Sequence, residues 1–243
     1  MEEFYQLMEY LPAAFKNEKD GEYITYLRDS FEQNYQNCKY QFAILACHMI
    51  YMSFVYFSVW QIKNSKPEDF SKSLIGFTKD EENSLITASS PFAFVKINEA
   101  RIFRFLKLIE CKNDAVGNFS KLVQQRNDIA HSNGNIFYTD GSSADKKVGE
   151  VLVQVACIQQ CMTSVIHDCL RCFPLDSWNE DERGYHDAID QIREVLIHPN
   201  YLSQKDIETC LTFDIDSLID HEHFEAIKEL FGVFVKAYRQ NES

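Results

Sequence analysis

Glycine and proline are scarce in this chain, with 8 and 5 among 243 residues, and the sequence holds no low-complexity tract, fixed-period repeat or long proline-rich linker. These absences exclude a repeat array and argue against disorder. The composition is 45% hydrophobic and 14% aromatic, which is enough to bury one large core. Alternation of apolar and polar residues between hairpin turns is also lacking. We therefore expect an all-α fold.

A charged-then-apolar signal segment is also lacking at the start, which reads MEEFYQLMEYLP and is acidic. Most of the eight cysteines fall inside apolar helical patterns, as reduced cysteines do. We expect a cytoplasmic protein. A zinc site could use Cys157, Cys161, Cys169 and Cys172, but on one helix the two pairs point about 120° apart. No metal or cofactor is expected.

One long run, Phe42 to Trp60, has no formal charge and approaches the length of a membrane span. His48, Ser53 and Ser58 interrupt it. A helix that is apolar all round can equally form the centre of a soluble bundle. We predict a buried helix and no membrane, with a membrane-associated form as the alternative. His48 is interpreted as a core histidine, although a cleft in the bundle could use it.

Charge of one sign is concentrated at one end. The formal net charge is −13, and residues 176–243 carry 16 acidic and 6 basic side chains, or −10. Residues 96–126 reverse the sign, with seven basic and three acidic side chains. The run could be a solvated helix face or could meet phosphates. We predict a helical bundle over 1–175 and an acidic helical extension over 176–243, which we expect to restrain a phosphate-binding site on the bundle.

Apolar residues at helical spacing predict the individual helices. A first long helix is expected over 21–63, and two or three shorter helices through 70–77, 78–87 and 94–110. A further helix is expected over 113–131, with Asn133 and Gly134 ending it. Residues 133–147 are expected to form a loop. Further helices are expected over 148–173, 185–197, 203–211 and 221–239, and SQKD at 203–206 matches a capping box.

The most unusual stretch is KLVQQRNDIAHSNGN, residues 121–135. Arg126 continues the apolar stripe of Leu122 and Val123, so its guanidinium must be paired, line a cavity or meet a ligand. Asn127 and His131 are four residues apart and share a helix face. A cation, an amide and an imidazole together suit RNA cleavage by the ribose 2′-hydroxyl: histidine moves protons, and arginine stabilises the phosphorane without a metal.

RNDIAH, residues 126–131, resembles the signature of the HEPN superfamily, an arginine and a histidine separated by four residues. The resemblance implies a HEPN-like helical bundle over 1–175 and a metal-independent endoribonuclease of the toxin, anti-phage or CRISPR type. It implies Arg126 and His131 as catalytic residues, Asn127 as a supporting one, and a homodimer with a composite active site. The expected substrate is RNA, with tRNA or single-stranded loops as candidates, and a regulatory protein partner is expected.

Other interpretations of the motif stay open. Arg126 could pair with Glu99 or Asp168, and His131 could cap its own helix. The chain would then be a non-catalytic HEPN-like scaffold or partner-binding module. The HEH sequence at 221–223 is interpreted as an acidic helix surface rather than a metal site.

Overall fold

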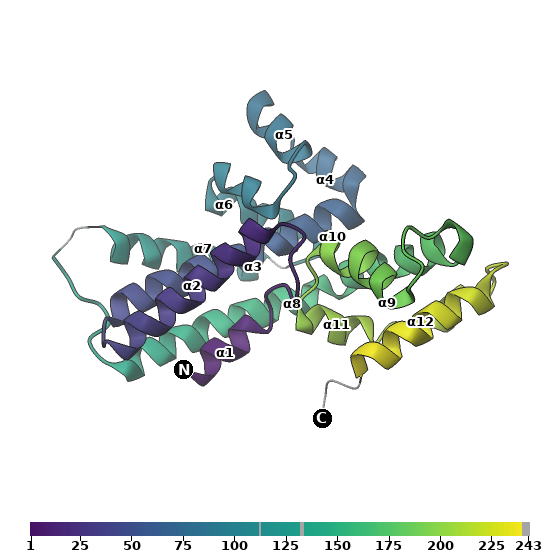
Figure 1. The fold of residues 1–243 in the computed structure, drawn as a ribbon. Helices are drawn as coiled ribbons and strands as arrows, with labels where there is room; N and C mark the ends of the chain where they lie inside the picture. The colour runs from purple at the N-terminus through teal and green to yellow at the C-terminus, as the bar shows by residue number, and fades with distance from the viewer. Residues whose placement is uncertain (112, 132–133, 240–243) are drawn as a thin grey trace.

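Two long helices, α3 (Tyr40–Ser65) and α8 (Gly141–Ser177), pack against each other at the centre of the computed structural model (Figure 1). The structure describes residues 1–111, 113–131 and 134–239, without the side chains of 113–116 and 118–120. About 76% of the chain is helical, and the described residues form no strand, only an isolated bridge between Pro12 and Ser203. The fold is all-α, as predicted.

The first half of the chain surrounds α3. Between Ala43 and Ile62 only Leu45 and Met49 are not buried, which fits a helix without a polar face. α3 and α8 are both long and apolar enough to cross a membrane, and 83% and 33% of their most apolar stretches are buried in the protein. In this half, the elements that contact α3 are α2 (Glu18–Gln36), α4 (Pro67–Ser73), η1 (Pro91–Lys96), α6 (Glu99–Ile102), η2 (Phe103–Ile109) and α7 (Asn113–Ala130). α1 (Glu2–Met8) packs against α8, and α5 (Lys79–Ile86) against η1.

The single helix expected over 21–63 is wrong. The chain turns between α2 and α3, where Cys38 adopts a left-handed conformation with φ of 57°. Two asparagine amides precede the turn: Asn34 donates to the carbonyl of Ser30, and Asn37 to that of Gln33. Such local bonds compete with helix continuation. The turn folds α2 back along α3.

The expected loop over 133–147 is too long, because α8 already begins at Gly141. Asp140 caps the helix and accepts a hydrogen bond from the Ser143 amide at 2.9 Å. Gly134 has the left-handed φ of 77° expected after a helix end, while Asn133 lies outside the described residues. α7 ends at Ala130, close to the predicted end.

The last quarter of the chain packs against the bundle. Its elements are η3 (Glu180–Glu182), α9 (Ala188–Gln191), the π-helical η4 (Ile192–Ile197), α10 (His198–Asn200), α11 (Gln204–Cys210), η5 (Ile215–Leu218) and α12 (Phe224–Arg239). The predicted capping box is confirmed at Ser203 and Asp206. The predicted boundary at residue 175 falls in the last turn of α8, and the largest buried cluster includes side chains from both sides of it.

Candidate functional site

Arg126 projects from α7 toward the start of α6, where it meets Glu99. Its Nη2 donates to both carboxylate oxygens of Glu99 at 2.6 Å, and the side chains are 29% and 24% exposed. Of the two carboxylates that the sequence suggested as partners, Glu99 is therefore the one in contact. Asp168 instead accepts a hydrogen bond from Ser65. Arg126 is thus a paired residue that still reaches the surface.

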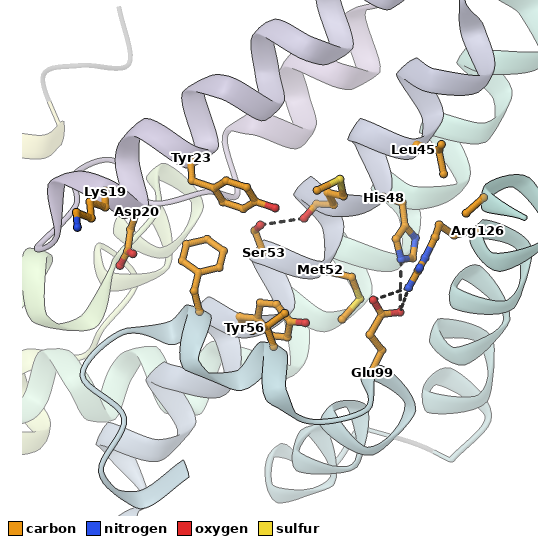
Figure 2. Close-up of a pocket in the computed structure, with 14 residues that line it drawn as sticks. Lys19, Asp20, Tyr23, Leu45, His48, Met52, Ser53, Tyr56, Glu99 and Arg126 are labelled. Carbon is orange, nitrogen blue, oxygen red and sulfur yellow. Dashed lines mark hydrogen bonds and ion pairs between the residues drawn. The ribbon is translucent and has the colours of Figure 1, made fainter. Parts of the chain in front are cut away.

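His48 of α3 approaches the same carboxylate (Figure 2). Its Nε2 lies 3.8 Å from Oε2 of Glu99, beyond hydrogen-bond length. Burial lowers the pKa of His48 below its ordinary value of 6.5, and Arg126 lowers it further, while Glu99 opposes both. Burial alone would raise the pKa of Glu99, but His48 and Arg126 lower it more. At neutral pH the cluster therefore holds a neutral imidazole beside an ion pair.

Two polar atoms of this cluster have no hydrogen-bond partner within the described chain. They are His48 Nε2 and Arg126 Nε, and both are shielded from bulk solvent. Buried polar atoms in folded proteins are nearly always partnered, so an unpartnered pair needs an explanation. Both residues line the same cavity, where a bound molecule could supply the missing bonds.

The cavity has a volume of about 700 Å³ and lies between α2, α3, η1 and α7. Its wall is mainly apolar, with Leu45, Met49, Met52, Phe92 and Val95 beside the phenols of Tyr23 and Tyr56. A second hollow of about 400 Å³ adjoins it and is lined by Lys96, Asn98, Val123 and Asn127. Val95, Glu99 and Arg126 line both. The ion pair therefore stands at the boundary between an apolar cavity and a polar groove.

The three predicted site residues are only partly brought together. Asn127 is half-buried and shares the polar groove with Arg126. His131 is exposed just past the end of α7, and its amide donates to the Asn127 carbonyl at 3.1 Å. It is absent from the described walls of both hollows. Five residues turn His131 about 140° away from Arg126 on the helix, so one chain does not bring the two side chains together.

The neighbourhood of Arg126 contains groups that the sequence did not point to. His48 is buried as expected of a core residue and also lines the cavity, the alternative that the sequence left open, whereas the aromatic wall of Tyr23, Tyr56 and Phe92 has no sequence signal. The only hint was an uncharged run interrupted by one imidazole. The three aromatic residues come from three different elements, which a pattern along one helix cannot connect.

The remaining candidates carry no ligand cluster. The structure finds no group of three or more histidine, cysteine or acidic side chains able to hold a metal ion among the described residues. Cys169 is buried and Cys172 is exposed, so that pair does not face one site. His223 stacks on Trp178 at 3.6 Å between ring centroids. In the basic stretch, Arg101 is paired with Glu81 at 2.7 Å.

Lys96, Arg104 and Lys107 are exposed and therefore available to an anionic partner.

Comparison with known proteins adds nothing to this picture, because no protein-family model, curated protein or solved structure matches the chain.

Proposed function

We propose that this protein is a metal-independent endoribonuclease with Arg126 and His131 as catalytic residues and Asn127 as a supporting one. The observation that carries the proposal is the polar groove, in which Arg126 and Asn127 lie beside the exposed Lys96. A phosphodiester in this groove would meet a guanidinium, an amide and an ammonium group. Of these residues, the resemblance to HEPN ribonucleases gives Arg126 a catalytic role and Asn127 a supporting one.

The reaction is an internal transfer at phosphorus. The ribose 2′-hydroxyl loses its proton to a base and attacks the phosphorus, and the bond to the leaving 5′-oxygen breaks as an acid protonates that oxygen. Arg126 stabilises the charge on the phosphorane. His131 transfers a proton. Since His131 points away from Arg126 in one chain, a second copy would supply its histidine in a homodimer, as the resemblance implies.

The first experiment incubates the purified protein with total RNA in EDTA and compares wild type with His131→Ala. We expect cleavage to persist without divalent metal and to leave a 2′,3′-cyclic phosphate, and the variant to lose a factor of about 10² to 10⁴ in rate. His186→Ala, another exposed histidine, is the matched control and should cleave normally. Products with 3′-hydroxyl ends would contradict the mechanism.

The second experiment replaces Arg126 by lysine. We expect poor activity, because an ammonium group cannot reproduce the two-pronged contact of a guanidinium. Arg104→Lys changes an exposed arginine in the same basic stretch and should have little effect. Normal activity of Arg126→Lys would indicate that Arg126 has a structural role and not a catalytic one.

One observation favours a second candidate, a non-catalytic scaffold. Glu99 already contacts Arg126 through both carboxylate oxygens, so the guanidinium charge is balanced within one chain. Intact RNA after incubation with a folded wild-type protein would support this candidate. The toxin or defence role and the regulatory partner belong to the proposal on the resemblance alone, and the cytoplasmic location belongs to it on the cysteines within apolar helical patterns.

A further inference from the structure

One of the two adjoining hollows is apolar and the other is polar, just as a nucleotide joins a largely apolar base to a charged phosphate. The cavity is apolar with an aromatic side, and the groove holds Lys96, Asn98 and Asn127. We propose that the cavity receives one unpaired base of a single-stranded RNA while its phosphate lies in the groove. This inference rests on the proposed function and specifies its substrate as RNA with an unstacked base at this position.

The aromatic wall suits a planar ring. Phe92 of η1 meets Tyr23 at 5.1 Å between ring centroids and 87° between planes, and meets Tyr56 at 6.3 Å and 81°. Both tyrosine rings therefore stand nearly at right angles to Phe92, a ring that also lines the cavity. Methionine sulfur at Met49 and Met52 adds polarisable contact area. Unpaired RNA bases are commonly held by stacking on such side chains.

The polar end of the cavity suits the edge of a base. The two unpartnered atoms, His48 Nε2 and Arg126 Nε, lie beside the Glu99 carboxylate (Figure 2). The His48 side chain is only 7% exposed, so water cannot freely satisfy it. Arg126 Nε donates, Glu99 accepts, and a neutral imidazole can do either. The Watson–Crick edge of every base combines donors and acceptors, whereas a purely apolar ligand would leave these atoms without partners.

Phosphate fits the groove better than the cavity. Inside the cavity the charge of Arg126 is balanced by Glu99, the lining holds one further cation and one further carboxylate in Lys19 and Asp20, and apolar walls make burial of an anion costly. The groove shares Arg126 but adds the exposed Lys96 and is open to solvent. A volume of about 700 Å³ is within the usual range of about 300 to 1,000 Å³ for sites that hold small molecules.

The experiment measures binding without cleavage. The full-length chain is titrated, with fluorescence anisotropy as the readout, into eight-residue 2′-O-methyl oligonucleotides of adenosine, cytidine or uridine, which lack the nucleophilic hydroxyl. An abasic strand of equal length is the second probe. Met49→Trp fills the cavity from a side chain that is 44% exposed, and Ile86→Trp is the matched control at 47% exposure on α5, outside both hollows. Phe92→Leu is a second variant that keeps apolar bulk and removes the ring.

We expect Met49→Trp and Phe92→Leu to weaken binding of the base-containing strands by about 5- to 100-fold, the effect of losing one stacked base. Binding of the abasic strand should not change, and Ile86→Trp should bind as wild type. Equal affinities for all proteins, or an equal loss with the abasic strand, would overturn the inference. So would displacement of the strands by free nucleoside 3′-monophosphates at lower concentration than by the oligonucleotides, because the cavity would then serve a free nucleotide.

The outcome is separable from the proposed function. Base-dependent binding with intact total RNA would refute the nuclease and keep the base site. Cleavage that depends on His131, together with cavity variants that bind RNA like wild type, would keep the nuclease and refute the base site.

Discussion

At the scale of single residues, Glu99 determines the state of its two neighbours. It balances the charge of Arg126 through both carboxylate oxygens and stands 3.8 Å from the imidazole of His48. A half-buried cation that is paired on one side can still offer its free N–H groups to a ligand. The contact with Glu99 is therefore compatible with a structural role of Arg126 and also with its proposed catalytic role.

The buried imidazole predicts a pH dependence of stability. The folded-state pKa of His48 lies below its ordinary 6.5, so below pH 6.5 the unfolded chain binds the proton more readily than the folded one. Stability from this group is complete above pH 6.5 and is lost as the pH falls toward the folded-state pKa. Between pH 6.5 and 5.5 we expect a loss of up to about 1 kcal/mol from His48, since the unfolded imidazole is already half protonated at pH 6.5. Urea unfolding at both values measures it.

The control for this prediction is His48→Phe, which places a ring without a titratable group among apolar neighbours. Its free energy of unfolding should fall less than that of wild type over the same pH interval. Parallel losses in the two proteins would show that other groups cause the pH dependence. Glu99 does not interfere in this interval, because its lowered pKa moves its own titration further into acid.

At the scale of helices, Asp206 connects α11 to both central helices through hydrogen bonds. It is 3% exposed and accepts hydrogen bonds from Gln61 of α3 at 2.9 Å and Gln159 of α8 at 2.7 Å. It also accepts from the backbone amide of Ser203 at 2.9 Å. One carboxylate therefore caps α11 and ties it to the bundle.

Replacement of Asp206 by alanine removes the acceptor of three N–H groups, although the Gln61 side-chain nitrogen also donates to the Tyr201 carbonyl at 3.5 Å. We expect a net loss of about 2 kcal/mol in the free energy of unfolding, since each unsatisfied buried donor costs about 1 to 3 kcal/mol and the removed buried charge offsets part of this. Glu208→Ala is the control on the same helix, because it removes only partly exposed contacts to Lys205. Equal midpoints of the two variants in urea would contradict the proposed role.

The sequence predicted those helices best whose signals are local. The cap at Ser203 and the helical spacing of α8 depend on residues within a few positions of each other, and the structure confirms both. The turn at Cys38 was missed because an αL residue between two apolar patterns has no strong signal. Arg126 could be singled out from its stripe. His48 could not be joined to it, because their proximity depends on the packing of α3 against α7.

At the scale of the whole molecule, the acidic extension is part of the packed structure. Ile192, Leu196 and Tyr201 are at most 1% exposed, the Trp60 indole donates to the Pro199 carbonyl, and the Tyr201 hydroxyl donates to Asp20. Removal of residues 176–243 would uncover the matching apolar surface of α3 and α8. We therefore expect the truncated chain to aggregate, as measured by size-exclusion chromatography. A soluble monomer with an unchanged helical spectrum would contradict this expectation.

The structure also bears on whether the acidic charge restrains the proposed RNA site. Lys147 near the start of α8 bonds to Gln125, next to Arg126, whereas Trp178 after its end stacks on His223 within the acidic segment. At a rise of about 1.5 Å per residue, the thirty residues between them span about 45 Å. Figure 1 likewise places α12 and α7 at opposite ends of the molecule. Charges separated by several screening lengths of about 8 Å hardly interact at physiological salt.

A variant that removes four negative charges tests whether the extension restrains the site electrostatically. It combines Asp220→Asn, Glu222→Gln, Glu225→Gln and Glu229→Gln, and the fold should tolerate these amides because all four side chains are exposed. We expect its RNA affinity to stay within about twofold of wild type at 0.15 M salt, since the separation exceeds the screening length severalfold. Lys96→Gln, in the groove beside Arg126, is the contrasting variant and should weaken binding and reduce its salt dependence, because it removes a phosphate contact. If the four amides instead strengthen binding at low salt, and the gain disappears as salt rises, the extension does restrain the site electrostatically. In that case a second copy of the chain would have to bring its acidic end near the groove, since within one copy the distance is too large.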